Sequence, residues 1–308
     1  MNISSSRRSF LLTSASSVAT VAAGRYGWAA EAEKKPLLID THVHCFAGKD
    51  DKRFPYHSRG PYQPEDVATP EHLIKCMDEA GVDYAVIVHP EPYQDDHRYL
   101  EHCLAVGGTR LKGTLLLFCD RPGSLEQLPD LVKRLAVVAL RVHAYAPERL
   151  PPFGKPELRR LWKAAAEHSL AIQLHLEPRY APHFEPLIEE FRDTRVVIDH
   201  LGRPLQGSPE EHAVIVRWSR FPNTVMKVSS LPATRMYPHR DAGPVIKQLT
   251  EAYGADRMIY GGGFGAAATG KSHRDAFDAG RSYLAHLPAA DQAKILGVNA
   301  AKLFKFSS

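Results

Sequence analysis

The sequence predicts an α/β protein built as a single parallel (β/α)8 TIM barrel. Short apolar runs alternate with segments of helical period from Leu37 to the end of the chain, and this alternation indicates strands joined by crossover helices. Eight such units fill about 270 residues and leave no room for a second domain. Polar residues, histidines above all, gather where the strands end. A barrel of this kind carries its chemistry at that end.

The strands follow one another along the chain at regular intervals. They are predicted at Leu37–His42, Tyr84–His89, Leu111–Phe118, Val137–His143, Ala171–Leu176, Val196–His200, Thr224–Ser229 and Arg257–Gly261. An open, doubly wound sheet is the alternative. It would place a glycine-rich phosphate-binding turn after the first strand. The glycine run 261–263 follows the last strand instead and lacks the required spacing.

Helix signals lie between the strands. Thr69 is expected as the N-cap of a helix over Thr69–Ala80, with Pro70 at the first helical position. A second helix is expected over Pro156–His168, and a closing helix over Ala290–Lys305. Two tryptophans lie in helical segments and are expected to pack in the outer ring of helices, at positions Trp162 and Trp218.

Residues 1–32 are predicted to be a twin-arginine signal peptide, which leaves 33–308 as the barrel domain. Arg7 and Arg8 precede a mildly apolar stretch, and a cleavage site of the A-x-A type ends at Ala32. The alternative is a membrane anchor, but the stretch is too short and too rich in Ser and Thr to span a bilayer. We therefore expect the twin-arginine export machinery as a partner, a periplasmic or otherwise exported location, and no membrane span in the mature protein.

Composition narrows the function classes. The chain has 308 residues, 44% hydrophobic and 24% charged, which excludes fibrous, disordered and multi-span membrane proteins. The formal charge of +4 could suggest nucleic acid, but removing the leader takes away three arginines and one glutamate and leaves 36 basic and 34 acidic residues. No nucleic-acid partner is expected. The four cysteines lack the C-x-x-C spacing of zinc ribbons and redox motifs, and the sequence names no disulfide.

Six of the 16 histidines lie at or just past a predicted strand end: His42, His44, His89, His143, His175 and His200. His42 and His44 alternate on one strand, so both imidazoles face the same side and can converge on one ion. A pair of hydrogen-bonded core histidines is the alternative. Because His175 and His200 end other strands of the same barrel, a functional cluster is favoured.

Several motifs resemble the amidohydrolase-related (amidohydrolase 2) family of metal-dependent TIM-barrel hydrolases, over essentially all of the mature chain. They are Ile39-Asp40-Thr41-His42-Val43-His44, Leu174-His175, Ile198-Asp199-His200-Leu201-Gly202-Arg203-Pro204 and the closing stretch 295–304. Thr69-Pro70-Glu71 and Val88-His89-Pro90-Glu91-Pro92-Tyr93 are similar to the branch that contains 2-pyrone-4,6-dicarboxylate lactonase and sugar lactonases such as fuconolactonase.

This resemblance implies a mononuclear site. His42, His44 and His175 would hold one divalent metal, zinc or manganese, with His200 nearby as the acid-base or water-orienting group. Two metals are not expected, because the fourth strand carries Arg141 and His143 where a binuclear site needs a bridging lysine or glutamate. Members of the lactonase branch also work without a tightly bound metal, so the ligands alone do not imply occupancy.

The sequence departs from the family pattern at the eighth strand. Most family members carry an aspartate there that acts as metal ligand and general base, and the aligned position is Gly263. Three interpretations stay open: a weakened protein that only binds a ligand, a hydrolase in which His200 or His143 takes the proton, or a decarboxylase-type lyase with different base requirements. An aspartate at this position is expected to point into the barrel mouth.

The substrate is expected to be a small anionic molecule. The first loop, from Cys45 to Ala68, is long enough to act as a lid. Arginine side chains bind carboxylates through paired hydrogen bonds. The candidate substrate-binding residues are Arg59, Tyr62, His89, Arg141 and Arg203, and the candidate catalytic residues are His200, His175 and His143. The predicted function is therefore an exported hydrolase of small lactones or related C–O or C–N bonds in carboxylated substrates.

Overall fold

The computed structural model describes residues 35–145, 155–231 and 241–307. The barrel forms one compact unit, Pro36–Ser308. The predicted leader at 1–32 lies outside the described residues. In the part that is described, no helix is both long and apolar enough to cross a membrane.

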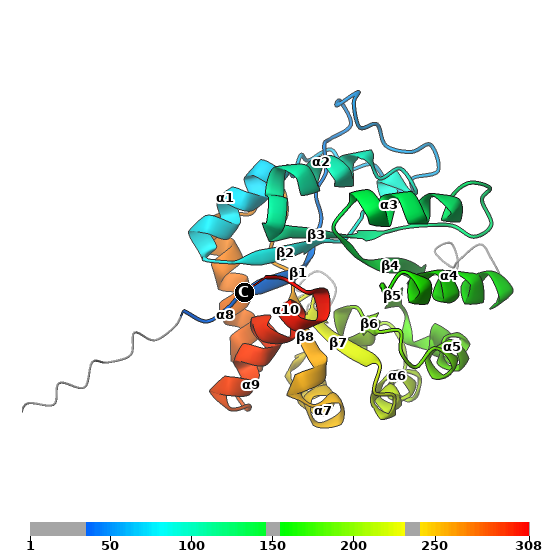
Figure 1. The fold of residues 1–308 in the computed structure, drawn as a ribbon. Coiled ribbons are helices and arrows are strands. Elements are labelled where there is room, and N and C mark those ends of the chain that lie inside the picture. Colours follow the sequence, from blue (N-terminus) through cyan, green and yellow to red (C-terminus); the bar gives the residue numbers. More distant parts are fainter. Residues whose placement is uncertain (1–34, 146–154, 232–240, 308) are drawn as a thin grey trace, which may run out of the picture. The chain divides into compact units, whose positions relative to one another are not determined.

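The eight strands form one parallel sheet in the order of the sequence (Figure 1). They are β1 (Ile39–Val43), β2 (Tyr84–Ile87), β3 (Leu111–Leu115), β4 (Val137–Ala144), β5 (Ala171–Leu176), β6 (Val196–Ile198), β7 (Thr224–Ser229) and β8 (Met258–Gly261). The last strand returns to the first, where Thr41 donates its hydroxyl to the carbonyl of Tyr260 at 2.7 Å. The sheet is therefore a nearly closed barrel. The predicted (β/α)8 TIM barrel is confirmed, and the doubly wound sheet is excluded by the strand order.

Helices surround the strands (Figure 1). They are α1 (Pro70–Ala80), α2 (Arg98–Gly107), α3 (Leu128–Arg134), α4 (Lys155–Glu167), α5 (Glu185–Glu190), α6 (Pro209–Arg217), α7 (Gly243–Tyr253), α8 (Gly270–Tyr283), α9 (Ala289–Ala293) and α10 (Asn299–Phe304). Thr69 caps α1 as predicted, since its side chain accepts a hydrogen bond from the backbone N–H of His72. Helix α1 ends where Gly81 adopts the left-handed conformation with φ 72°.

The predicted closing helix is divided in the structure. A π-helical turn over Lys294–Val298 separates α9 from α10. Gly297 lies in this turn, and a Cβ atom there would come within 2.1 Å of the carbonyl oxygen of Leu37. The wider turn and the missing side chain together let the closing segment pack directly against the chain that leads into β1.

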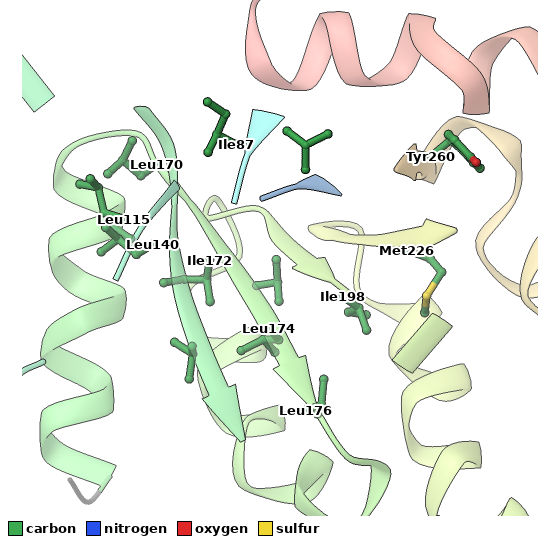
Figure 2. Packing of buried hydrophobic residues seen from close by; sticks show 14 of the residues in the cluster. Ile87, Leu115, Leu140, Leu170, Ile172, Leu174, Leu176, Ile198, Met226 and Tyr260 are labelled. Atoms are coloured by element: carbon green, nitrogen blue, oxygen red, sulfur yellow. The ribbon is translucent and has the colours of Figure 1, made fainter. Parts of the chain in front are cut away.

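Apolar side chains on the outer face of the sheet pack against the helices. Figure 2 shows Ile172, Leu174 and Leu176 on β5 and Ile198 on β6 within this layer. Trp162 and Trp218 are completely buried in it, as predicted. Burying each such side chain stabilises the fold by about 1.5–3 kcal/mol.

The inner face of the barrel changes from apolar to polar along the strands. At the amino-terminal end it is apolar and is covered by Phe304 of α10, and the strand residues of this layer are Ile39, Val86, Ala139, Ala171, Val197, Val225 and Ile259. Residues two positions further along a strand face the same side. The next layer therefore contains the polar side chains of Arg141, Gln173, Asp199 and Lys227, all buried. The layer after that carries His143, His175 and Ser229.

Candidate active site

His42 and His44 lie on β1 and face the interior together. The register of β1 against β2 shifts between Asp40 and Val43, which turns both imidazoles inward while Val43 packs outward among the apolar side chains. The two rings are 5.1 Å apart, edge to face. His44 donates from Nδ1 to the carbonyl of Val88 at 2.7 Å. The predicted convergence of the two side chains is therefore present.

The other strand-end histidines extend this pair into a continuous cluster. The ring of His200 lies 4.5 Å from that of His42 and 4.8 Å from that of His175. His143 follows at 5.6 Å from His175. Four strand ends thus bring five predicted histidines together, and we call His42, His44, His143, His175 and His200 the histidine cluster.

His200 is held by an unusual backbone segment. The chain leaves β6 in a left-handed turn, in which His200, Leu201 and Arg203 have φ angles of 56°, 58° and 52°. Such conformations cost non-glycine residues about 1 kcal/mol or more each. The turn ends β6 at Ile198, two residues before the predicted end. It sets the imidazole Nδ1 of His200 within 2.8 Å of the hydroxyls of Ser229 and Ser230.

A charged layer lies directly beneath the histidine cluster. The carboxylate of Asp199 is completely buried and accepts hydrogen bonds from Gln173 Nε2 at 2.9 and 3.0 Å. Lys227 Nζ lies 3.0 Å from Asp199 Oδ1, and Arg141 Nη2 lies 3.4 Å from Oδ2. Two cations thus face one carboxylate, and we call Arg141, Gln173, Asp199 and Lys227 the charged layer. Its net positive charge favours an anion in the space above it.

The electrostatics keep the imidazoles neutral. Burial, with the positive charge of Arg141, lowers the pKa of His44 to about 4. Burial also lowers the pKa of His200 to about 3, although the Asp199 carboxylate opposes the shift. The pKa values of His42 and His175 are also well below the usual value, with burial as the largest cause. At neutral pH each of these rings is therefore uncharged and keeps one nitrogen lone pair.

Asp199 stays ionised in spite of its burial. Burial opposes the charged form, but the attraction of Lys227, His42 and Arg141 outweighs it and holds the pKa of Asp199 well below its usual range. Burial lowers the pKa of Lys227, while the nearby Asp199 carboxylate raises it, so the net shift is downward. The pair is therefore a buried ion pair that depends on both partners.

Three side chains of this site offer a metal-binding arrangement. The ligand atoms of His42, Asp199 and His200 all lie within 4.8 Å of one another. The buried Nδ1 of His42 has no hydrogen-bond partner among the described residues, and its nearest carboxylate oxygen is Asp199 Oδ1 at 3.7 Å. Two imidazoles and a carboxylate with an open fourth position are the donor set of catalytic zinc sites. The residues present therefore fit a divalent ion.

His175, one of the three predicted ligands, lies outside that group. Arg141 Nη2 is 3.2 Å from its Nδ1. A guanidinium only donates hydrogen bonds, so Nδ1 accepts and the proton of the neutral ring resides on Nε2. Ligation through Nε2 would require the ring to give up that proton. The role of His175 as a ligand stays a prediction, and so does that of His44.

A second group of side chains borders the histidine cluster where the strands end. Tyr145 stacks on His175 with ring centroids 4.4 Å apart and donates its hydroxyl to Glu91 Oε2 at 2.6 Å. The guanidinium group of Arg203 lies over the Tyr145 ring, 4.7 Å from its centroid. Glu91 Oε1 is 3.7 Å from His143 Nδ1. Glu91 and Tyr145 were not predicted from the sequence.

The remaining predicted substrate-binding residues occupy different environments. Arg59 and Tyr62 are exposed on the first loop. This loop folds back toward the segment after β2, because the backbone N–H of His57 donates to the carbonyl of Pro92 at 2.8 Å. His89 is completely buried, and its Nε2 donates to the carbonyl of Gln94 at 2.9 Å. It packs beside His97 rather than in the histidine cluster, with ring centroids 4.4 Å apart.

Gly263 does not have the orientation expected of an aspartate position. Its φ is 125°, and a Cβ atom there would lie 2.7 Å from Ala276 Cβ and 3.1 Å from His273 Cδ2, both on α8. A side chain on this backbone would therefore point at α8 instead of into the barrel mouth. The turn is fixed by Asp40, which accepts hydrogen bonds from the N–H of Gly262 at 2.7 Å and from His273 at 2.9 Å.

The chain matches a known protein family over the whole barrel. The model of the family described as Amidohydrolase matches residues 39–306, which include every strand of the barrel and the whole histidine cluster. The chain belongs to the amidohydrolase family. The resemblance inferred from the strand-end motifs is thereby confirmed.

Individual relatives of this amidohydrolase agree with that assignment. It is 27% identical over 206 residues to an L-fucono-1,5-lactonase from Burkholderia ambifaria, covering 62% of this chain and 68% of the relative. Among solved structures it resembles a protein from Acinetobacter baumannii assigned as a 2-pyrone-4,6-dicarboxylic acid hydrolase and solved with citric acid bound. That match has 21% identity and a TM-score of 0.71 and covers 87% of this chain and 99% of the other.

A zinc-bound relative is also similar. An amidohydrolase from Burkholderia multivorans, solved with bound zinc, matches with 16% identity and a TM-score of 0.67, covering 88% of this chain and all of the other. At this level of identity the likeness concerns the fold. In the present protein, the observation that bears on a metal is its own group of potential ligands, His42, Asp199 and His200.

Proposed function

We propose that this amidohydrolase is an exported enzyme that hydrolyses a small lactone carrying a carboxylate. The observation that carries the proposal is the histidine cluster above the charged layer. Neutral imidazoles carry the lone pair that a general base needs. The excess positive charge of Arg141 and Lys227 over Asp199 favours both a carboxylated substrate and the oxyanion that forms during hydrolysis.

The relatives support a lactone as the substrate class. One is named for L-fucono-1,5-lactone and another for a pyrone dicarboxylate, and both compounds are cyclic esters. The second relative binds citric acid, a molecule with three carboxyl groups. In the present chain Arg141 and Arg203 supply guanidinium groups in the barrel mouth, where Arg203 is braced by the Tyr145 ring. Guanidinium groups of this kind suit a carboxylate.

Hydrolysis of the lactone needs a water molecule, a group that takes its proton and a positive charge beside the carbonyl oxygen. Water attacks the lactone carbonyl while His200 or His143 takes its proton, and the tetrahedral intermediate collapses by breaking the ring C–O bond. The proton then passes to the leaving oxygen, which gives a hydroxy acid. Arg141 and Lys227 stabilise the developing negative charge from below. The lactone must therefore lie with its carbonyl over the charged layer.

A divalent metal would be held by His42, His200 and Asp199, with His44 and His175 as the further ligands that the family resemblance implies. With His200 as a ligand, the proton would go to His143. When bound, a single zinc or manganese ion would polarise the carbonyl and lower the pKa of bound water. The residues of the chain orient that centre in either case: His44 is fixed by its bond to the Val88 carbonyl, and His200 is fixed by Ser229 and Ser230.

Gly263 keeps two other functions open. A barrel without a carboxylate on its eighth strand could bind a small anion without turning it over, or could act as a decarboxylase-type lyase. Both alternatives use the same cationic mouth. They differ from a lactonase in the product, which is an unchanged ligand or carbon dioxide instead of a hydroxy acid.

The test is a lactone screen with matched metal analysis. Purified protein is assayed by pH-stat titration with L-fucono-1,5-lactone, 2-pyrone-4,6-dicarboxylate and aromatic carboxylates, with and without a chelator, and bound metal is measured by elemental analysis. We expect acid release from a lactone, and loss of bound metal in the folded His42→Ala/His44→Ala double variant. Carbon dioxide release, or binding without turnover, would favour the alternatives. Equal metal content in both proteins would contradict the ligand assignment.

Export is proposed on the leader alone. The transport machinery recognises the paired guanidinium groups of Arg7 and Arg8 and not merely their charge. Replacing both with lysine is expected to leave the protein in the cytoplasm with its leader uncut, as measured by fractionation and mass spectrometry. Unchanged periplasmic delivery of the variant would show that the leader has another function.

A further inference from the structure

Glu91 is a buried carboxylate at the mouth of the barrel that the family pattern leaves without a role. It lies just past β2, in the short helical turn Glu91–Tyr93. Only 10% of its side chain is exposed. Carboxylates in such positions are retained only where other groups engage both oxygens, because burying an unpaired charge is costly.

Each oxygen of Glu91 faces a different partner. Oε2 accepts the hydroxyl of Tyr145 at 2.6 Å. Oε1 lies 3.7 Å from Nδ1 of His143, whose side chain is 8% exposed. Tyr145 in turn stacks on His175. Oε2 is therefore held through Tyr145 against His175, while Oε1 points at the imidazole of His143. The bond to Tyr145 thus directs Oε1 toward His143.

The other carboxylates around the barrel interior are engaged differently. Asp199 lies between Lys227 and Arg141. Asp40 holds the turn after β8 and pairs with His273 on α8. Glu177, which follows β5, pairs with Arg179 at 2.6 Å. Among these described side chains, Glu91 is the carboxylate that faces His143.

We propose that Glu91 is a positioning residue that makes His143 the general base of the lactone hydrolysis, a role that the family pattern gives to the strand-eight aspartate. The inference rests on the proposed function. The carboxylate oxygen Oε1 faces Nδ1 of His143 and favours the tautomer that carries its proton there, which leaves the lone pair on Nε2. A buried acid that fixes the tautomer of a histidine base is an established catalytic arrangement. At 3.7 Å the pair is looser than a hydrogen bond, and such contacts tighten when substrate binds.

The step balances without a further reactant. A water O–H bond breaks as its proton moves to His143 Nε2, and the water oxygen forms a bond to the lactone carbonyl carbon. The ring C–O bond then breaks, and the leaving oxygen takes the proton back from the imidazolium. Glu91 remains ionised throughout and stabilises the transient positive charge on His143. His143 is the catalytic residue of this pair.

Kinetics test the assignment with a matched control. In Glu91→Gln the amide N–H₂ donates to Nδ1 and favours the wrong tautomer, so we expect kcat to fall about 100-fold while KM changes less than about threefold. Glu91→Asp keeps the charge with a shorter reach and should fall in between. Glu177→Gln makes the same change just past the end of β5 and should leave kcat unchanged. Equal kcat values for Glu91→Gln and wild type would overturn the proposal.

Nitrogen NMR provides a readout that does not depend on turnover. With the signals of His143 identified by their loss in His143→Gln, wild-type ¹⁵N shifts should report Nδ1–H and an unprotonated Nε2, and Glu91→Gln should shift the ring toward Nε2–H. An Nε2–H ring in the wild type, or no change in Glu91→Gln, would overturn the proposal even if the enzyme is active. A wild type that hydrolyses no lactone would refute the proposed function, while the NMR result still decides whether Glu91 orients His143.

Discussion

At Gly263 the backbone does not have the orientation that the family motif predicts. Alignment to the family motif identifies it as the place of a missing aspartate. The structure shows that its backbone has turned toward α8, with Ala276 and His273 filling the space where a side chain would begin. Asp40 fixes this conformation through the N–H of Gly262. Restoring the carboxylate therefore does not restore the family site.

An alanine series across this turn tests that geometry. Gly263→Ala combines a positive φ with a clash at 2.7 Å, Gly262→Ala has a φ of 119° and its nearest neighbour at 3.8 Å, and Gly265→Ala meets nothing within 4 Å. We expect losses in the free energy of unfolding of about 2–4, about 1 and about 0 kcal/mol, measured by urea denaturation. Equal losses at 262 and 263 would show that α8 does not crowd the turn. Gly263→Asp is expected to be destabilised without gaining hydrolysis.

The charged layer makes a second prediction for single residues. Asp199→Asn leaves Lys227 and Arg141 facing each other without a carboxylate, and we expect it to lower the free energy of unfolding by about 3–5 kcal/mol. Adding Lys227→Met removes one of the two unpaired cations, so the double variant should be more stable than the sum of the single changes implies. Denaturation of the four proteins measures the coupling. Strict additivity would contradict the pairing of Asp199 with Lys227.

The bounds of a strand are predicted most accurately from the sequence where the strand is buried on both faces. The bounds of β5 and β7 match the predicted ranges, because their apolar runs end where the ladder ends. β6 stops at Ile198, since His200 enters a left-handed turn that no propensity rule signals. β2 and β3 are also shorter than predicted, because residues such as His89 and Phe118 leave the ladder for loops.

The candidate site could be predicted in part for the same reason. Histidines at strand ends are visible in the sequence, and the barrel brings five of them together. Of the charged layer only Arg141 was predicted, as a substrate-binding residue, although Gln173 and Lys227 likewise lie two positions before His175 and Ser229 on the inward face of their strands. Glu91 could not be found, because its contact with His143 joins the segment after β2 to the end of β4, which only the folded barrel brings together.

A substitution in helix α10 tests whether the amino-terminal end of the barrel serves stability alone while the other end carries the chemistry. Phe304 closes the apolar layer at the amino-terminal end and is 4% exposed. Phe304→Ala should lower the free energy of unfolding by about 3–5 kcal/mol, since it leaves a cavity, while kcat per folded molecule stays unchanged because the chemistry lies at the other end. Lys302→Ala, exposed on the same helix, is the control. A large fall in kcat for Phe304→Ala would show that the two ends are coupled.

For the whole molecule, the buried histidines predict instability in acid. The folded-state pKa values of seven described histidines are below the unfolded value of about 6.5, among them His44 at about 4 and His200 at about 3. The unfolded chain therefore binds protons first. Stability is full above pH 6.5 and falls as the pH drops toward 4, by up to about 1.4 kcal/mol per pH unit for each histidine.

Denaturation midpoints between pH 7.5 and 5 measure this slope. Replacing a buried histidine outside the cluster, as in His89→Gln, should reduce the slope by about one proton, while His183→Gln on the surface should leave it unchanged. A stability that does not change over this range would contradict the neutral, desolvated state of the histidine cluster.

The proposed lactonase activity is tested by the rate of ring opening of a carboxylated lactone by the purified protein and by His200→Gln, each shown to be folded by circular dichroism. We expect multiple turnovers for the wild type and a loss of at least about 100-fold in kcat for the variant, because it removes the imidazole that would orient the water or hold the metal. No turnover by the folded wild type, or equal rates for the two proteins, would contradict it.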